Sequence, residues 1–170
     1  MNPKLEAFFK EPEKAYLQPD ELNVLSQFVS SLPERINFYR RLRNEELTLL
    51  QTVADSLQQQ FPHESEDRLK SSLQNGILAL RCAAMAMLID DPTFVTRRLA
   101  SWLPDITSAY ETQAIDDALY RLLKQQFSAR FTHQQMALLS PGIEAAHALL
   151  SPQKGNDAAI TSETLVGLFN

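Results

Sequence analysis

The side chains that could carry chemistry are few in this chain and stand far apart. The 170 residues include one cysteine, Cys82, and three isolated histidines, His63, His133 and His147. No glycine-rich phosphate loop and no zinc-ligand spacing occurs. A cysteine nucleophile needs a nearby base, and no histidine lies near Cys82 in the sequence. The pattern favours a protein that is not an enzyme, with Cys82 as a small buried side chain or, less favoured, a thioether attachment point.

One predicted helix, over residues 65–89, carries a stripe of small side chains. They recur three or four positions apart and so share one face: Ser72, Asn75, Gly76, Ala79, Ala83 and Ala86. A glycine in a helix interior costs about 1 kcal/mol relative to alanine, so a close neighbour is expected. A tight helix crossing is the favoured interpretation. The alternative is a flat ligand lying on Ser72, Asn75, Gly76, Ala79 and Ala83.

Bulky residues on another face of the same helix form the predicted core face. They are Leu69, Leu73, Ile77, Leu80, Ala84 and Leu88. Their helical spacing is typical of an apolar stripe that packs on neighbouring helices.

The elements that position these residues are predicted to be helices throughout. Glycines are few and β-branched runs are short, which disfavours a sheet. Prolines and capping residues predict helices over 19–32, 33–61, 65–89, 92–103, a segment from 105, 115–127, 132–139 and 143–150, with a kink or turn at 140–142. Helices of unequal length without a heptad pattern indicate an all-α, globin-like fold.

The chain length suits one domain with an arm before it and a tail after it. The expected parts are a short N-terminal helical arm at 1–15, a globin-like domain at 16–150 and a polar tail at 151–170. The arm carries Leu5, Phe8 and Phe9 at helical spacing, so we expect it to cover a surface of its own chain or of a partner.

Charge and hydropathy exclude several classes of partner. The net charge of -5 gives no reason to expect a nucleic-acid partner. The N-terminal stretch has no apolar core of signal-peptide length, and we see no run approaching the ~18 apolar residues of a membrane span. We therefore expect a cytoplasmic protein without membrane insertion.

Three stretches, in this order, resemble the phycobiliproteins, which belong to the globin superfamily. Residues 16–22, YLQPDEL, resemble the start of that family's first body helix. Residues 80–91, LRCAAMAMLIDD, resemble its Leu-Arg-Tyr stretch and the acidic turn that follows. The next helix has the right order, with Arg98, Leu99 and Tyr110. The resemblance covers residues 5–150 and implies a globin-like fold.

The departures from the family's pattern fall where it holds its bilin pigment. By this resemblance the attachment cysteine falls at Ser72, the aspartate that holds the pyrrole nitrogens at Asn75, and the arginine that pairs with a propionate at Gln74. Serine cannot form the thioether bond. The resemblance therefore implies that no bilin is bound covalently at this position.

Among relatives without pigment, the chain most resembles the bilin biosynthesis-associated globins of cyanobacteria. This implies a non-enzymatic accessory role in bilin biosynthesis or phycobilisome assembly, with transient, non-covalent binding of biliverdin or phycocyanobilin, in the cytoplasm or at the thylakoid surface. The expected partners are bilin-synthesis enzymes or phycobiliprotein subunits. A protein-interaction module that binds no tetrapyrrole is the alternative. A haem or gas-sensing globin is a weaker one, since no histidine lies in 92–110, where the proximal ligand would stand.

The resemblance also implies a homodimer. In the family the arginine at position 81 pairs with an acid on the partner's arm, and that acid falls at Glu11 here. The expected interface residues are Phe8, Phe9, Glu11 and Arg81. An arm packed on its own chain is the alternative.

Overall fold

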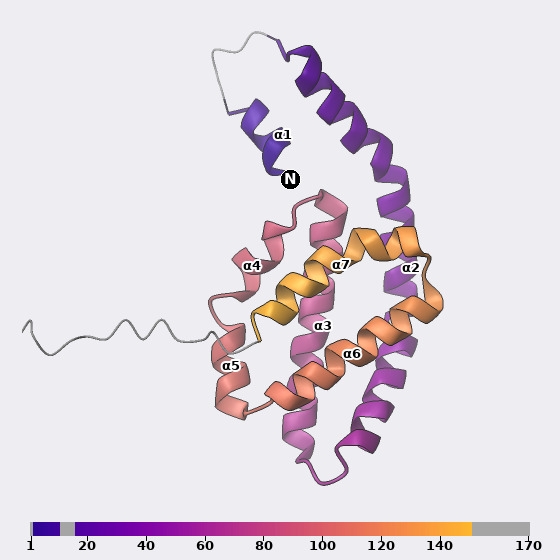
Figure 1. Ribbon diagram of the computed structural model, residues 1–170, viewed down its shortest axis with the longest axis vertical. Coiled ribbons are helices and arrows are strands. Elements are labelled where there is room, and N and C mark those ends of the chain that lie inside the picture. The colour runs from indigo at the N-terminus through magenta and orange to yellow at the C-terminus, as the bar shows by residue number, and fades with distance from the viewer. Residues whose placement is uncertain (1, 11–15, 151–170) are drawn as a thin grey trace, which may run out of the picture.

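A computed structural model describes residues 2–10 and 16–150 of the chain. The described residues form seven helices and no strand, packed around one another (Figure 1). They are α1 (Pro3–Phe8), α2 (Pro19–Gln60), α3 (Glu66–Ile89), α4 (Thr93–Leu99), α5 (Leu103–Tyr110), α6 (Gln113–Arg130) and α7 (His133–Ala148). The prediction of an all-α, globin-like fold is confirmed.

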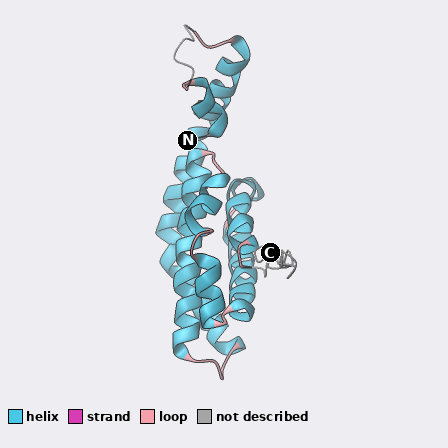
Figure 2. Cartoon of the chain, turned by 90° about the vertical axis from the view of Figure 1, so that its left-hand side faces the viewer, coloured by secondary structure: helices cyan, strands magenta, loops and turns pink. Residues whose placement is uncertain are grey.

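Helix α2 runs unbroken through Pro33, so the predicted boundary between helices at 19–32 and 33–61 is wrong. Proline removes one backbone N–H, which leaves the carbonyl of Val29 without its helical donor. Val29 and Pro33 are both exposed, so water can meet that carbonyl. The first fully buried side chain of α2 is Phe38, and the part before it projects beyond the body (Figures 1 and 2).

Helix α7 continues through Pro141 in the same way, so the predicted kink or turn at 140–142 does not end it. The carbonyl that loses its donor belongs to Ala137, which is exposed. The predicted start of this helix is confirmed, because the Thr132 hydroxyl accepts the Gln135 backbone N–H at 3.3 Å. The helix thus extends from the cap to Ala148 without interruption.

The polar turn between α3 and α4 forms as predicted. The Asp91 carboxylate accepts the backbone N–H of Thr93 at 3.1 Å, as an N-terminal cap does. The same carboxylate pairs with Arg97 at 2.6 Å. Helix α4 ends at Leu99, and Pro104 lies in the first turn of α5, where a proline is tolerated.

Helix α3 is the central helix of the fold and touches α2, α4, α5, α6 and α7. Its most deeply buried face is the small-residue stripe. The bulky face predicted as the core face is only half-buried at Leu69, Leu73, Ile77 and Leu88. Leu80 and Ala84 of the predicted face are buried, so that prediction is confirmed in part. The small-residue face is buried more deeply because small side chains admit the closest neighbours.

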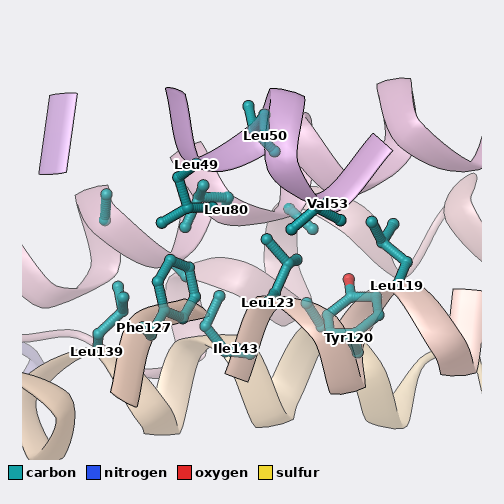
Figure 3. Packing of buried hydrophobic residues seen from close by; sticks show 14 of the residues in the cluster. Leu49, Leu50, Val53, Leu80, Leu119, Tyr120, Leu123, Phe127, Leu139 and Ile143 are labelled. Carbon is teal, nitrogen blue, oxygen red and sulfur yellow. The ribbon is translucent and has the colours of Figure 1, made fainter. Parts of the chain in front are cut away.

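The main core lies where α2, α3, α6 and α7 meet (Figure 3). Its side chains interdigitate between the four helices, and the largest contributors include Leu49, Val53, Leu80, Leu123, Phe127 and Ile143. Phe127 and Phe131 continue this core to Phe38, whose ring meets the Phe131 ring edge-on at 5.2 Å.

Helix α1 packs on its own chain. Leu5 is 1% exposed, and the Asn2 side-chain amide donates to the Asp90 carboxylate at 2.6 Å. Arg35 pairs with the same carboxylate at 2.6 Å. Phe9, at the end of this arm, stays 62% exposed.

Of the described helices, α3 alone is long and apolar enough to cross a membrane by length and composition, with an 18-residue window of mean hydropathy 1.4. The expectation that no run approaches this length is therefore corrected. The apolar composition of α3 is explained by packing, because its stripe and flanking residues pack against five neighbouring helices.

Candidate functional site

The small-residue stripe of α3 is closed by two helices. A Cβ added at Gly142 of α7 would lie 2.8 Å from the Ala83 Cβ and 2.9 Å from the Ala83 Cα. A Cβ added at Gly76 would overlap the Leu119 side chain of α6. Such close approach marks tight helix crossings on both sides of the stripe.

The stripe is therefore not an open surface for a flat ligand in this structure. All five candidate contacts are buried: Ser72, Asn75, Gly76, Ala79 and Ala83. Helices α6 and α7 pack on this face, as the favoured interpretation of a tight helix crossing predicts, and ligand binding at these five residues stays a prediction.

A buried acid meets the beginning of this stripe. Ser72 is 0% exposed, and its hydroxyl donates to the Asp116 carboxylate of α6. The Thr112 hydroxyl, at the start of α6, donates to the other carboxylate oxygen at 2.8 Å. Asp116 is itself only 1% exposed. Two hydroxyl donors thus hold the Asp116 carboxylate between α3 and α6. Both of these donors are neutral and neither is a cation.

Three buried polar atoms on the described helices α3, α5 and α6 have no hydrogen-bond partner. Among the described side chains, the buried nitrogen or oxygen atoms without a hydrogen-bond partner are Asn75 Nδ2, Thr107 Oγ1 and the Tyr120 hydroxyl. Asn75 lies one turn beyond Ser72 on α3, and Tyr120 lies one turn beyond Asp116 on α6. The Thr107 hydroxyl is close enough to lower the pKa of Asp116, although it lacks a well-formed hydrogen bond.

We call Ser72, Asn75, Thr107, Thr112, Asp116 and Tyr120 the polar cluster. Burial raises the pKa of Asp116, against the lowering effect of the neighbouring hydroxyls. Burial also raises the pKa of Tyr120, and the charge of Asp116 adds to this. Figure 3 shows the Tyr120 hydroxyl pointing from α6 into the core. The buried carboxylate is thus held between α3 and α6 by neutral hydroxyl donors.

Helix α5 lies beside α3 (Figure 1), with Thr107 close to the Asp116 carboxylate. Leu103 and Thr107 are its buried residues. Its C-terminal end is held by Arg68 of α3, which donates to the Tyr110 carbonyl at 2.9 Å and to the Glu111 carbonyl. Glu111 follows with φ of 52°, a left-handed conformation that is uncommon for a side chain other than glycine.

The predicted interface residues are only partly brought together. Arg81 pairs within its own chain with Glu46 of α2 at 2.5 Å, and its side chain is still 61% exposed. The two residues border a groove of about 440 Å³ between α2 and α3. Phe8 is half-buried and Phe9 exposed, while Glu11 lies outside the described residues. The contact between Glu11 and Arg81 of a second copy therefore stays a prediction.

The remaining reactive side chains form no centre of their own. Cys82 is half-buried, and burial raises the pKa of its thiol. His147 stacks on the Tyr120 ring at 4.8 Å and bonds the Asp117 carboxylate at 2.9 Å. Within residues 2–10 and 16–150, no group of three His, Cys, Asp or Glu side chains could hold a metal ion.

Sequence reasoning found Ser72 and Asn75 but missed the residues that complete the polar cluster. Asp116 resembles an ordinary first-turn acid of a helix, a place that acids favour anyway. Its spacing from Tyr120 and Leu123, however, puts it on the apolar face of α6. The sequence feature that could have identified Asp116 is the presence of an acid on the apolar face of a predicted helix.

Comparison with known proteins supplies a family match. A family model described as "Phycobilisome protein" matches residues 10–150, which extends from the arm to the end of the helical body. No curated protein matches the chain at a significant level.

Proposed function

The chain belongs to the phycobilisome protein family, and from this premise we propose that it is a non-enzymatic accessory protein for bilin biosynthesis or phycobilisome assembly that carries no covalent pigment. Members of the family are structural pigment-carrying proteins, not enzymes. They usually form oligomers with other phycobiliprotein subunits. We propose an accessory role and not light harvesting because of the residue at one position in α3.

That position is Ser72, where the resemblance to phycobiliproteins implies the attachment cysteine. A serine hydroxyl cannot form the thioether, and here it is buried and donates to Asp116. The alternative attachment point, Cys82, is half-buried with a raised thiol pKa, so little of the nucleophilic thiolate forms near neutral pH. These two observations support a protein without attached pigment.

Covalent attachment is tested by incubating the full chain with phycocyanobilin and running a denaturing gel stained for bilin fluorescence with zinc. We expect no fluorescent band from the wild type or from Cys82→Ser. A band in the wild type that disappears in Cys82→Ser would show attachment at Cys82 and overturn the proposal.

Reversible bilin binding is the function that we favour within this role. It is supported by the family, whose members normally bind bilins, and by the buried Asp116 carboxylate that meets Ser72, the position where the resemblance implies the attachment cysteine. Absorbance titration with biliverdin and with phycocyanobilin tests it. A red-shifted, sharpened band that is lost on denaturation supports a reversible carrier. No spectral change at tens of micromolar would remove this function.

A protein-interaction module that binds no tetrapyrrole is the second candidate. It is favoured by the closure of the small-residue stripe under α6 and α7, and by the exposed Phe9 and the projecting start of α2. Sedimentation tests whether this module forms a homodimer through the arm. Glu11→Arg should shift the chain toward monomer if Glu11 reaches Arg81 of a second copy. An unchanged sedimentation coefficient would count against that contact.

A further inference from the structure

We propose that a groove between α6 and α7 binds a flat ring that carries a carboxylate or phosphate group. The groove lies on the outer face of α6, opposite the buried face that packs on the core. The inference therefore concerns a different part of the molecule from the small-residue stripe and goes beyond the proposed function. It assigns His147 as the surface on which the ring stacks, and Arg121 and Lys124 as the cations that meet the acidic group.

The groove is formed by α6 and by one residue of α7, which lies beside it (Figure 1). Its volume is about 530 Å³, within the range of about 300–1,000 Å³ that is usual for small-molecule sites. Asp117, Arg121, Lys124 and Ser128 border it at successive turns of α6, so they share one face. All seven bordering residues have polar side chains, so the groove suits a charged small molecule better than an apolar partner helix.

His147 presents a flat ring whose orientation is fixed by two contacts. The imidazole stacks on the Tyr120 ring at a centroid distance of 4.8 Å and an interplanar angle of 14°. Tyr120 is only 2% exposed, so the ring behind the imidazole has a fixed position. The Asp117 carboxylate binds the imidazole Nε2 at 2.9 Å. Because Tyr120 covers one face of the imidazole and the His147 side chain is still 34% exposed, the other face can stack on a second ring.

Two cations lie close to this ring along α6. Arg121 follows Asp117 by one turn, and Lys124 follows Arg121 by one turn. The Arg121 guanidinium donates to the neutral side-chain oxygen of Gln60 at 2.9 Å, which is the interaction shown for it in the described part of the chain. The Lys124 ammonium lies 3.9 Å from the Glu144 carboxylate, and exposed pairs of this kind contribute little. Both cations can therefore bind an acidic group of a ligand.

The chemistry of the ligand follows from this arrangement. A flat ring uses the open face of His147, and a guanidinium matches the geometry of a carboxylate or a phosphate. A ligand that has only one of these parts would lose either the stacking contact or the cations. Two kinds of small molecule share both parts: a bilin with its propionates and a nucleotide with its phosphate. A solvated helix face that binds neither is the competing explanation.

Calorimetric titration of the full chain with two pairs of probes tests the site. Biliverdin is compared with its dimethyl ester, and adenosine monophosphate is compared with adenosine, so each pair shares a ring system and differs in its acidic group. We expect the acidic member of at least one pair to bind about tenfold more tightly than its uncharged partner, the effect of one hydrogen bond to a charged group. The pair that shows this difference identifies the source of the ring. Added salt should reduce the difference, because exposed charges are screened.

Three variants separate the two parts of the site. The double variant Arg121→Gln with Lys124→Gln removes the cations and should abolish the difference within the pair. His147→Ala removes the stacking surface and should also weaken binding of the uncharged member, by about tenfold. Lys70→Gln, an exposed lysine of α3 that borders another groove, is the matched control and should bind as the wild type does. Circular dichroism shows that each variant is folded.

The outcomes separate this inference from the proposed function. The site is overturned if the wild type binds none of the four probes. It is also overturned if the double variant binds the acidic probes as tightly as the wild type does, and tight binding of biliverdin by both proteins would then leave the bilin carrier in place. Binding of adenosine monophosphate without binding of biliverdin supports the site and counts against the carrier.

Discussion

Adding one methyl group at Gly142 tests whether the small-residue stripe of α3 is a helix crossing. In Gly142→Ala the new Cβ would meet the Ala83 Cβ at 2.8 Å and the Ala83 Cα at 2.9 Å. Carbon atoms pack best about 3.5–4.0 Å apart, so α7 must move away from α3. Neither atom of Ala83 belongs to a flexible side chain that could rotate aside. The whole crossing must therefore adjust.

The magnitude follows from two opposing effects. Overpacking of a tight core site costs about 1–3 kcal/mol. Replacing a helical glycine by alanine returns about 1 kcal/mol through backbone entropy. Because both Ala83 contacts are under 3.0 Å and neither atom can rotate aside, the overpacking cost should lie at the upper end, about 2–3 kcal/mol. We therefore expect Gly142→Ala to lower the free energy of unfolding by about 1–2 kcal/mol. Gly76→Ala meets only the end of the Leu119 side chain, which can shift, so its effect should be smaller.

Urea unfolding followed by circular dichroism measures both variants against the wild type. Ala137→Gly, at an exposed position of α7, calibrates the helix-propensity effect and should cost about 1 kcal/mol. A Gly142→Ala protein as stable as the wild type, or more stable, would refute the crossing. The stripe would then be open, and the flat-ligand surface expected from the sequence would return.

Three further perturbations address the site and its surroundings. Burial raises the folded-state pKa of Asp116, so the stability it contributes is present below its unfolded pKa and is lost as pH rises through the folded value. Asp116→Asn should therefore gain stability relative to the wild type from pH 4 to pH 7 in urea titrations, and a constant difference would contradict this. Burial raises the thiol pKa of Cys82, so it should react with a disulfide reagent at pH 8 much more slowly than free cysteine; equal rates would contradict the burial. The pair of exposed Arg81 and half-buried Glu46 should be worth less than about 1 kcal/mol in a double-mutant cycle, whereas a larger coupling would indicate a desolvated pair.

Local signals in the sequence predicted much of the fold. Ser65 and Thr132 cap α3 and α7 where expected, and the turn at Asp91 forms as the sequence indicates. Interior prolines misled the prediction, since Pro33 and Pro141 both stand inside continuous helices. An interior proline leaves one carbonyl without its donor, and whether water can meet that carbonyl depends on exposure, which the tertiary fold decides.

The candidate site was predicted in part. Ser72 and Asn75 were found, because the resemblance to phycobiliproteins pointed to their positions. Asp116 was not found, because it lies 44 residues from Ser72 and only their hydrogen bond connects them. The sequence alone also did not show which acid pairs with Arg81. Glu46 of the same chain forms this ion pair and so competes with the predicted contact to Glu11 of a second copy.

By itself the sequence determined the helices, most of their caps, the small-residue stripe on α3 and the family. Each of these depends on neighbours within a few turns or on the identity of single residues. The tertiary structure alone decided which face of α3 lies innermost, and it brought the Asp116 carboxylate to Ser72 and Thr112. The physical reason is that helical periodicity places residues on a common face, while only the crossing of two helices determines what that face meets.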